Sequence, residues 1–289
     1  MKARFAGLLF TGLVAAGCVT VKVTDDQKPA APTAVKSALG AVAAEISEAN
    51  LRGHVEKMVG FGTRHTLSDT ISPTRGIGAA RRWVESEFKV MSAACGECLQ
   101  IVLPSDTVTG QRVPTPTQVV DVVAIQRGTG DPQRVIIIQG HLDSRISDVM
   151  NFTADAPGAN DDASGVAVVM ETARVLSKRS FSATLVYAAL SGEEQGLLGG
   201  RILAEYAKVQ GWQVLAVLNN DIVGNTRGLA QTVENRVRIF SEGVRSLESD
   251  AQGNARRSVG GEVDSPSRNL ARYMDEIAEQ HLPSFDVSM

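Results

Sequence analysis

Residues 134–144 read Arg-Val-Ile-Ile-Ile-Gln-Gly-His-Leu-Asp-Ser, and after a loop residues 157–165 read Pro-Gly-Ala-Asn-Asp-Asp-Ala-Ser-Gly. The run of β-branched apolar residues in the first stretch is typical of a strand buried on both faces of a parallel sheet. Ligands of open α/β sheets bind beyond the carboxyl ends of the strands, so polar residues that follow such a strand indicate a site. Those residues are His141, Asp143, Asp161 and Asp162.

An imidazole together with several carboxylates indicates a divalent metal of the zinc type. The alternative is a solvated loop in which the aspartates only cap helices.

The composition is typical of a globular protein. Its 289 residues, 43% of them hydrophobic, can bury a core in one large domain or in two smaller ones. The formal net charge is −3, so there is no excess of basic residues that would indicate nucleic acid as a partner.

The first 18 residues have the pattern of an export signal. A lysine and an arginine precede an apolar stretch, residues 5–16, that is short for a bilayer span, and small residues lead to Cys18. This ending resembles the bacterial lipoprotein signal, in which cleavage leaves a lipidated N-terminal cysteine. The alternative is an ordinary secretory signal in which Cys18 is incidental. We expect a signal peptide over residues 1–18, a flexible polar tether over residues 19–33, and an exported periplasmic or cell-envelope lipoprotein that contacts the membrane only through its anchor.

Export affects the interpretation of the remaining cysteines, Cys95 and Cys98. If Cys18 carries lipid, these two form an even pair in an oxidising compartment. Their Cys-x-x-Cys spacing also fits a redox motif or half of a zinc site, but the chain has no second cysteine pair to complete a structural zinc site. We expect a short-loop disulfide that contributes little stability.

Apolar periodicity predicts strands and helices that alternate through one domain, residues 34–289. Residues 104–116 are turn-rich and predict a hairpin or a longer loop, and the polar residues 241–262 predict a surface insertion or lid. A histidine in a Gly/Thr loop, His65, is interpreted as a hydrogen-bonding residue. The expected strands are 99–103, 118–126, 135–138, 184–190, 214–218 and 237–240, and the expected helices are 34–59 (one bent or two short), 74–91 opened by Pro73, 163–177, 197–209 and a covering helix 267–280.

Three successive strands of this pattern end in acidic groups. His141 and Asp143 follow the first, Glu193 and Glu194 the second, and Asp221 the third. Helices intervene, so the strands are expected to be parallel and right-handed crossovers bring these ends to one edge of the sheet. Gathered carboxylates repel one another, and the only lysine or arginine within these motifs is Arg145. A bound cation is therefore the economical explanation.

The same motifs resemble the co-catalytic zinc aminopeptidases of peptidase family M28. In the family's order the chain has Gly-His-Leu-Asp-Ser, Gly-Ala-Asn-Asp-Asp-Ala-Ser-Gly, Ser-Gly-Glu-Glu-Gln-Gly-Leu-Leu-Gly and Asn-Asn-Asp-Ile-Val-Gly, within residues 140–224. A weaker similarity extends upstream through residues 61–65. We expect an α/β fold, a three-layer α/β/α sandwich with a mixed, mainly parallel central sheet.

The resemblance implies two zinc ions and assigns roles around the first. His141 and Asp221 would bind one zinc, Asp161 would bridge both ions, and Asp143 would orient the imidazole of His141. Asp162 would stand beside the bridge in the unusual backbone geometry that the family shows there.

At the second zinc, the resemblance implies that Glu194 is a ligand and that Glu193 is the general base and acid. The family also places a final histidine ligand well downstream, after an aspartate. The only histidine after Asp221 is His281, and the residue immediately before it is a glutamine, not an aspartate. We therefore expect this chain to be incomplete at its C-terminus, with the Glu194 zinc short of one ligand.

The resemblance implies a metallo-aminopeptidase that hydrolyses N-terminal peptide bonds of peptide substrates through a zinc-activated water. Two other hypotheses remain open. The first is that the chain has carboxypeptidase, deacylase or glutaminyl-cyclase activity, since the same scaffold carries these chemistries. The second is that it is a catalytically incomplete relative that only binds its ligand.

Overall fold

The computed structural model of the chain describes residues 39–282 and 284–289. The expected signal peptide, the tether and Cys18 lie outside these residues. Within them, no helix combines the length and the apolar character that crossing a membrane requires. The helices are α2 (Glu48–Val59), α3 (Gly76–Ala94), α4 (Ser164–Leu176), α5 (Leu198–Val209), α6 (Asp250–Ser258) and α7 (Pro266–His281), with a π-type turn η1 (Ala159–Ala163) before α4. The strands are β1 (Leu99–Val102), β2 (Ser105–Gly110), β3 (Val113–Val120), β4 (Val122–Gln126), β5 (Asp131–His141), β6 (Ala183–Leu190), β7 (Gln213–Asn219), β8 (Arg236–Arg238) and β9 (Asp286–Ser288).

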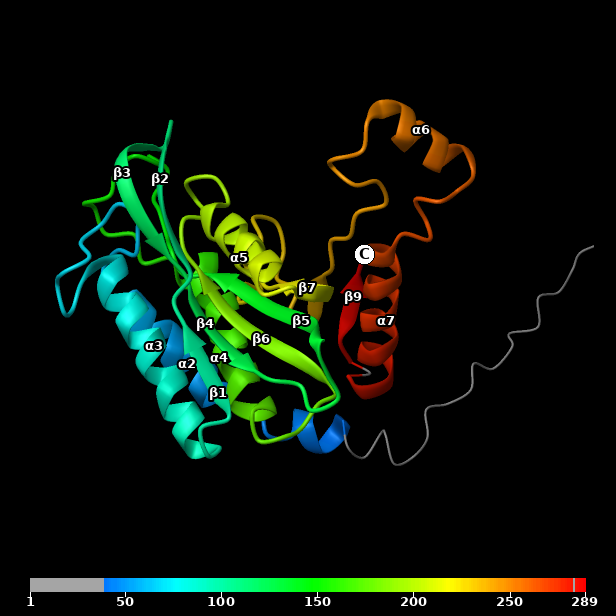
Figure 1. The fold of residues 1–289 in the computed structure, drawn as a ribbon, viewed down its shortest axis with the longest axis horizontal. Helices are drawn as coiled ribbons and strands as arrows, with labels where there is room; N and C mark the ends of the chain where they lie inside the picture. Colours follow the sequence, from blue (N-terminus) through cyan, green and yellow to red (C-terminus); the bar gives the residue numbers. More distant parts are fainter. Residues whose placement is uncertain (1–38, 283) are drawn as a thin grey trace, which may run out of the picture.

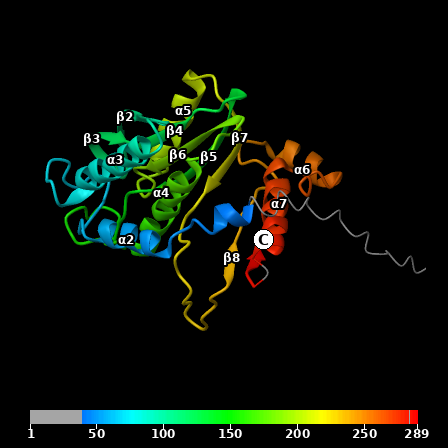
Figure 2. The same cartoon turned by 90° about the horizontal axis from the view of Figure 1, so that it is seen from below.

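The centre of the fold is a five-stranded mixed sheet with the order β1-β4-β6-β5-β7. β5 pairs in parallel with both β6 and β7, β4 is antiparallel to β6, and β1 is antiparallel to β4. Four of the five strands therefore run in the same direction, as the sequence predicted. Figure 1 and Figure 2 show α2, α3 and α4 against one face of the sheet and α5 against the other.

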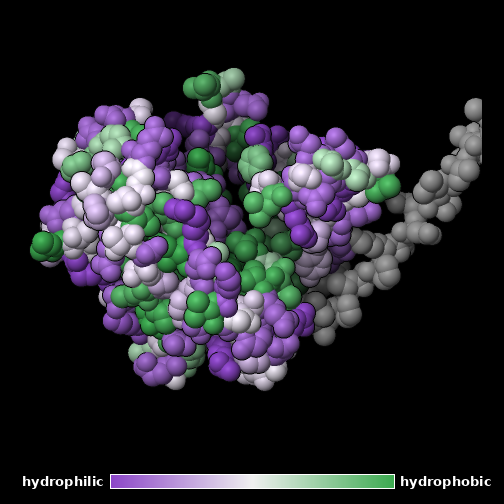
Figure 3. All heavy atoms as spheres, turned by 45° about the horizontal axis from the view of Figure 1, so that its top comes forward, coloured by the Kyte–Doolittle hydropathy of each residue, from purple (hydrophilic) through white to green (hydrophobic). Residues whose placement is uncertain are grey.

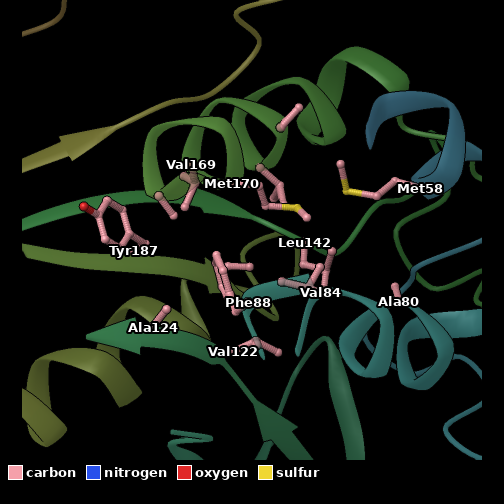
Figure 4. Close-up of a cluster of buried hydrophobic side chains, with 14 of the residues drawn as sticks. Met58, Ala80, Val84, Phe88, Val122, Ala124, Leu142, Val169, Met170 and Tyr187 are labelled. Atoms are coloured by element: carbon pink, nitrogen blue, oxygen red, sulfur yellow. The ribbon is translucent and has the colours of Figure 1, made fainter. Parts of the chain in front are cut away.

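Strand β6 explains the three layers, because its apolar residues are buried on both faces. Leu185, Tyr187 and Ala189 pack in the core under α2, α3 and α4. The alternate residues, Val186, Ala188 and Leu190, belong to a second core cluster with Leu203 of α5. Figure 4 shows the first cluster, in which Phe88 of α3, Met170 of α4 and Tyr187 of β6 gather on one face of the sheet. Each fully buried side chain of this size contributes about 1.5–3 kcal/mol. The α/β/α sandwich is thus confirmed.

The prediction of one strand over residues 118–126 was wrong in one respect. The chain forms two strands, which meet at the buried Asp121. The Asp121 N–H donates to the Pro104 carbonyl, and its carboxylate accepts a hydrogen bond from Ser191 N, so this residue leaves both ladders. Before the break, β3 pairs with β2, and the hairpin expected around residues 104–116 is confirmed.

Two helical boundaries also differ from the prediction. Pro73 does not open α3, which begins at Gly76, where φ is +86°. The preceding loop folds back onto the first turn, and Ile77 N donates to Ser68 Oγ. At the N-terminal end of the described chain, residues 39–43 are helical and separate from α2, so of the two alternatives for residues 34–59 the two short helices are correct.

The C-terminal part lies beside the five-stranded sheet (Figure 1). β8 and β9 form a separate parallel pair, and α7 packs on β9 with only Ala271 buried. The helix predicted over residues 267–280 is thus present as α7, and the strand that it packs on is β9. β7 remains an edge strand with Val214 and Leu215 about half exposed, and Figure 3 shows apolar surface in the hollow between the two parts. The polar residues 241–262 contain a helix that the sequence did not predict, α6, which a capping box at Ser249 begins.

Candidate metal centre

The carboxyl ends of β5, β6 and β7 lie level with one another. His141 is the register partner of Leu190 at the end of β6, and Gln139 pairs with Asn219 at the end of β7. The segments that follow these strands therefore emerge side by side at one edge of the sheet. This is the physical reason why residues 80 positions apart in sequence meet there.

Three of the predicted ligands form a compact group. His141 Nε2 lies 3.0 Å from Asp161 Oδ1 and 3.9 Å from Asp221 Oδ1. The three candidate ligand atoms all lie within 4.8 Å of one another, and this is the only such group of three or more acidic, histidine or cysteine side chains among the described residues. The His141 side chain is buried, whereas those of Asp161 and Asp221 are 45% and 39% exposed. The group is therefore open to solvent on one side.

Asp143 contacts the ring nitrogen of His141 that points away from the other two ligands. His141 Nδ1 lies 3.1 Å from the Asp143 carbonyl oxygen and 3.6 Å from its Oδ1, so the imidazole directs Nε2 toward Asp161. The buried Asp143 carboxylate also accepts hydrogen bonds from the backbone N–H groups of Glu193 and Glu194. One side chain thus connects the loops after β5 and β6.

The electrostatics at His141 favour a positive charge. Burial lowers the pKa of His141, but hydrogen bonds with Asp143 and Asp161 outweigh that effect and raise the pKa to about 12. A carboxylate environment that holds a proton this firmly on the imidazole would also favour a metal cation at the same place.

Asp161 and Asp162 point in different directions. Asp161 faces the group, whereas the buried Asp162 carboxylate accepts hydrogen bonds from His141 N and Gly165 N. Burial raises the pKa of Asp162 to about 7. The peptide bond between the two aspartates is cis, an unusual backbone geometry of the kind that the family resemblance implied here.

A residue that sequence reasoning did not single out, Arg64, holds the loop before Asp161. Its fully buried guanidinium donates hydrogen bonds to the carbonyls of Leu142, Met58, Pro157 and Gly158. Burial lowers the pKa of Arg64 to about 10. The only signal in the sequence was its place in the Gly-Thr-Arg-His stretch, since a buried arginine has no pattern of its own.

The neighbouring His65 lies outside the metal group. Its Nδ1 accepts a hydrogen bond from Leu67 N, and its Nε2 lies 3.0 Å from the Val149 carbonyl. The structure thus places it as a hydrogen-bonding residue.

The loop after β6 presents two glutamates with different surroundings. Glu194 does not join the metal group in the described chain, because its buried carboxylate pairs with Arg145 Nε at 2.5 Å. The role of Glu194 as a ligand of a second zinc stays a prediction. His281, at the end of α7, is also outside the group.

The Glu193 carboxylate is half-buried and has no hydrogen-bond partner among the described residues. Burial raises its pKa, the charge of His141 opposes that rise, and Asp143, Glu194 and Asp221 add to it. A carboxylate with a raised pKa beside a metal group is suited to accept and return a proton.

The group His141, Asp161 and Asp221 fits a zinc ion. One imidazole nitrogen and two carboxylate oxygens are ordinary zinc donors, and catalytic zinc sites have three protein ligands with a fourth position left for water or substrate. The 39–45% exposure of the two aspartates leaves room on the solvent side for that position.

Comparison with protein families identifies the chain. Residues 121–271 match the model of peptidase family M28. The chain belongs to this family. The chain is also similar to a probable zinc metalloprotease of Pyricularia oryzae, 43% identical over 254 residues, which are 87% of this chain and 51% of that protein. Another, from Leptosphaeria maculans, is 43% identical over 251 residues, 86% of this chain and 58% of that protein. The chain spans about half the length of the curated relatives it matches.

Solved structures share the fold of this chain. The LapA aminopeptidase of Legionella pneumophila superposes with a TM-score of 0.63 at 19% identity, over 88% of this chain and 57% of that one. A glutaminyl cyclase of Porphyromonas gingivalis superposes with a TM-score of 0.51 at 20% identity, over 62% of each chain. At these identities the similarity concerns the fold alone.

Proposed function

We propose that this M28 chain is a zinc-dependent aminopeptidase that hydrolyses N-terminal peptide bonds, with Glu193 as general base. The observation that supports it best is the pairing of two features at one sheet edge. His141, Asp161 and Asp221 form a group suited to zinc, and the adjoining loop carries Glu193, whose carboxylate has no hydrogen-bond partner among the described residues.

Zinc held by these three residues would supply Lewis acidity, which polarises a peptide carbonyl and makes water a better nucleophile near neutral pH. Glu193 removes a proton from the attacking water and delivers it to the departing amine. Its raised pKa suits both transfers, because a base that accepts a proton readily can also return it. The Asp143 carboxylate accepts a hydrogen bond of 3.1 Å from Glu193 N and lies 3.6 Å from His141 Nδ1. One buried side chain therefore fixes the position of the general base relative to the zinc ligand.

Charge supports the amino end of a peptide as the substrate end. The exposed rim of the group is formed by Asp161 and Asp221, and Glu193 stands half-buried beside them. Zinc would balance the charges of Asp161 and Asp221, so the negative charge left at the site is that of Glu193, which attracts the α-ammonium group of a peptide and repels a terminal carboxylate. An aminopeptidase is therefore favoured over a carboxypeptidase.

The test is hydrolysis of aminoacyl-p-nitroanilides by the zinc-loaded chain, with N-acetylated versions of the same substrates as the comparison. We expect activity that N-acetylation abolishes and that Glu193→Gln reduces by about 100-fold or more. Glu205→Gln, a substitution of an exposed glutamate on α5, is the matched control and should leave the rate unchanged.

Equal cleavage of acetylated substrates would refute the exopeptidase assignment. Formation of pyroglutamate from N-terminal glutamine, without nitroanilide hydrolysis, would favour cyclase chemistry instead. A folded, zinc-loaded protein that is inactive on both substrates would favour a binding protein.

We also propose, from the pattern of residues 1–18, that the protein is exported and carries lipid at Cys18. Labelled palmitate should enter the wild-type protein in a bacterial host and should not enter Cys18→Ser. Label in the variant, or none in the wild type, would refute the anchor.

A further inference from the structure

The family resemblance implied a second zinc bound by Glu194, but in this structure the Glu194 carboxylate pairs with an arginine. Glu194, the expected ligand, comes from the loop after β6, and its side chain is only 8% exposed. A buried carboxylate requires a counter-charge close by, because burial alone disfavours its ionised form. Among the described residues that counter-charge is Arg145, whose Nε donates to Glu194 Oε2 at 2.5 Å.

The position of Arg145 in the chain explains why it reaches Glu194. It follows His141 by four residues, and the intervening Leu142, Asp143 and Ser144 are fully buried. Its backbone is therefore held at the same sheet edge as the metal group. Its Nη1 donates to its neighbour, the Ile146 carbonyl, which orients the guanidinium.

The Arg145 guanidinium lies against the carboxylate that the family resemblance assigns to a second cation. Besides Glu194, its charge acts on Asp161 of the metal group and on Glu193. Arg112 approaches the same glutamate differently, since its Nη1 donates to the Glu194 backbone carbonyl at 2.9 Å. Of these two arginines, only Arg145 neutralises the carboxylate.

Apart from His141, no histidine of the described chain belongs to a group of candidate metal ligands. The sequence contains four histidines. His141 belongs to the group already described, His65 contacts Val149 and Leu67, His54 packs edge-on against Trp83, and His281 ends α7.

We propose that this chain binds a single zinc ion, at His141, Asp161 and Asp221, and that Arg145 takes the place of a second cation beside Glu194. The proposal rests on the metal centre of the proposed function. Formal charges agree with it: one Zn²⁺ balances the two aspartates of the group, and one guanidinium balances Glu194, which leaves Glu193 as the carboxylate free for proton transfer.

Zinc titration of the metal-free 289-residue chain tests the proposal, by calorimetry together with elemental analysis of the dialysed protein. We expect one tightly bound ion per chain and any second ion at least about 100-fold weaker. Arg145→Gln should strengthen the second binding event by about 10-fold or more, because it frees Glu194 and removes a like charge. Arg112→Gln, which leaves the Glu194 carboxylate paired, is the matched control and should behave as the wild type.

A second variant keeps the test decisive if Arg145→Gln does not fold. Glu194→Gln should leave the tight site within about threefold of wild type, because Glu194 is not one of its ligands. Loss of the tight site in Glu194→Gln would overturn the proposal. Two ions of comparable affinity in the wild type, or an Arg145→Gln protein whose second site is unchanged, would overturn it as well.

The outcomes separate this proposal from the proposed function. A protein that binds one zinc as described but hydrolyses no peptide supports the single-ion centre and refutes the peptidase. A protein that hydrolyses peptides with two equivalent zinc ions does the reverse, and a folded protein that binds no zinc refutes both.

Discussion

Asp121, the residue that separates β3 from β4, should make the stability of the protein depend on pH. Its side chain is fully buried, accepts a hydrogen bond from Ser191 N through Oδ1, and leaves Oδ2 without a partner among the described residues. Burial raises the pKa of Asp121 to about 7, while the Ser191 hydrogen bond and the charge of Arg81 oppose the rise and Asp143 adds to it.

The sign and size of the effect follow from the difference in proton affinity. The pKa of aspartate in an unfolded chain is near 3.8, so the folded protein holds this proton more tightly than the unfolded chain. The resulting stability is complete below pH 4 and is lost as the pH rises through 7. Each pH unit between those values is worth about 1.4 kcal/mol, so ionised Asp121 lowers the free energy of unfolding by about 4 kcal/mol above pH 7.

Asp121→Asn keeps an acceptor for Ser191 N and removes the ionisation. We expect its free energy of unfolding to equal that of wild type near pH 4 and to exceed it by about 4 kcal/mol at pH 8. Urea denaturation in EDTA at several pH values measures the difference without a contribution from metal. The exposed Asp106→Asn is the control and should show no such trend. A difference between Asp121→Asn and wild type that is constant over this range would refute the reasoning.

Three further predictions concern the centre itself. Arg64→Met should lower the free energy of unfolding by about 4 kcal/mol in urea denaturation, because four backbone carbonyls lose a buried charged donor; a loss below about 1 kcal/mol would contradict the role given to this guanidinium. Gly165→Ala should lower both the melting temperature and the affinity for zinc, because the new Cβ would lie 2.2 Å from the carbonyl oxygen of Asn220. Gly200→Ala is the control: the new Cβ meets open space, so the substitution should be neutral or slightly stabilising. Zinc at 100 times its dissociation constant should stabilise the wild type by about 2.7 kcal/mol in thermal denaturation and leave His141→Asn unchanged; equal stabilisation of both proteins would place the ion elsewhere.

Much of the architecture could be read from patterns in the sequence. Continuous apolar runs such as Val135–Ile138 belong to strands buried on both faces, and helices between such strands require parallel connections. Once the strands are parallel, the polar residues at their carboxyl ends must meet. Hence the ends of the strands place His141 near Asp221, the family resemblance adds Asp161, and the candidate ligand atoms of these three residues lie within 4.8 Å of one another.

Patterns in the sequence did not predict every strand boundary or the element on which each helix packs. The break at Asp121 was missed because an apolar run contains no sign that one aspartate turns inward to bind Ser191 N. The strand on which α7 packs was not predicted for a related reason. An apolar stripe shows that a helix packs on something, but it does not say whether the partner is the main sheet or β9.

The residues at the ends of the strands follow from local properties of the chain, because hydrophobic periodicity and connection handedness can be read without knowing any long-range contact. Which charges pair at those ends depends on how distant segments pack. Arg64 and Arg145 are both arginines close to motif residues, yet one is buried against four carbonyls and the other neutralises Glu194. That difference arises from the direction in which each long side chain leaves its loop, and the loops take their shape from contacts made by residues far away in the chain.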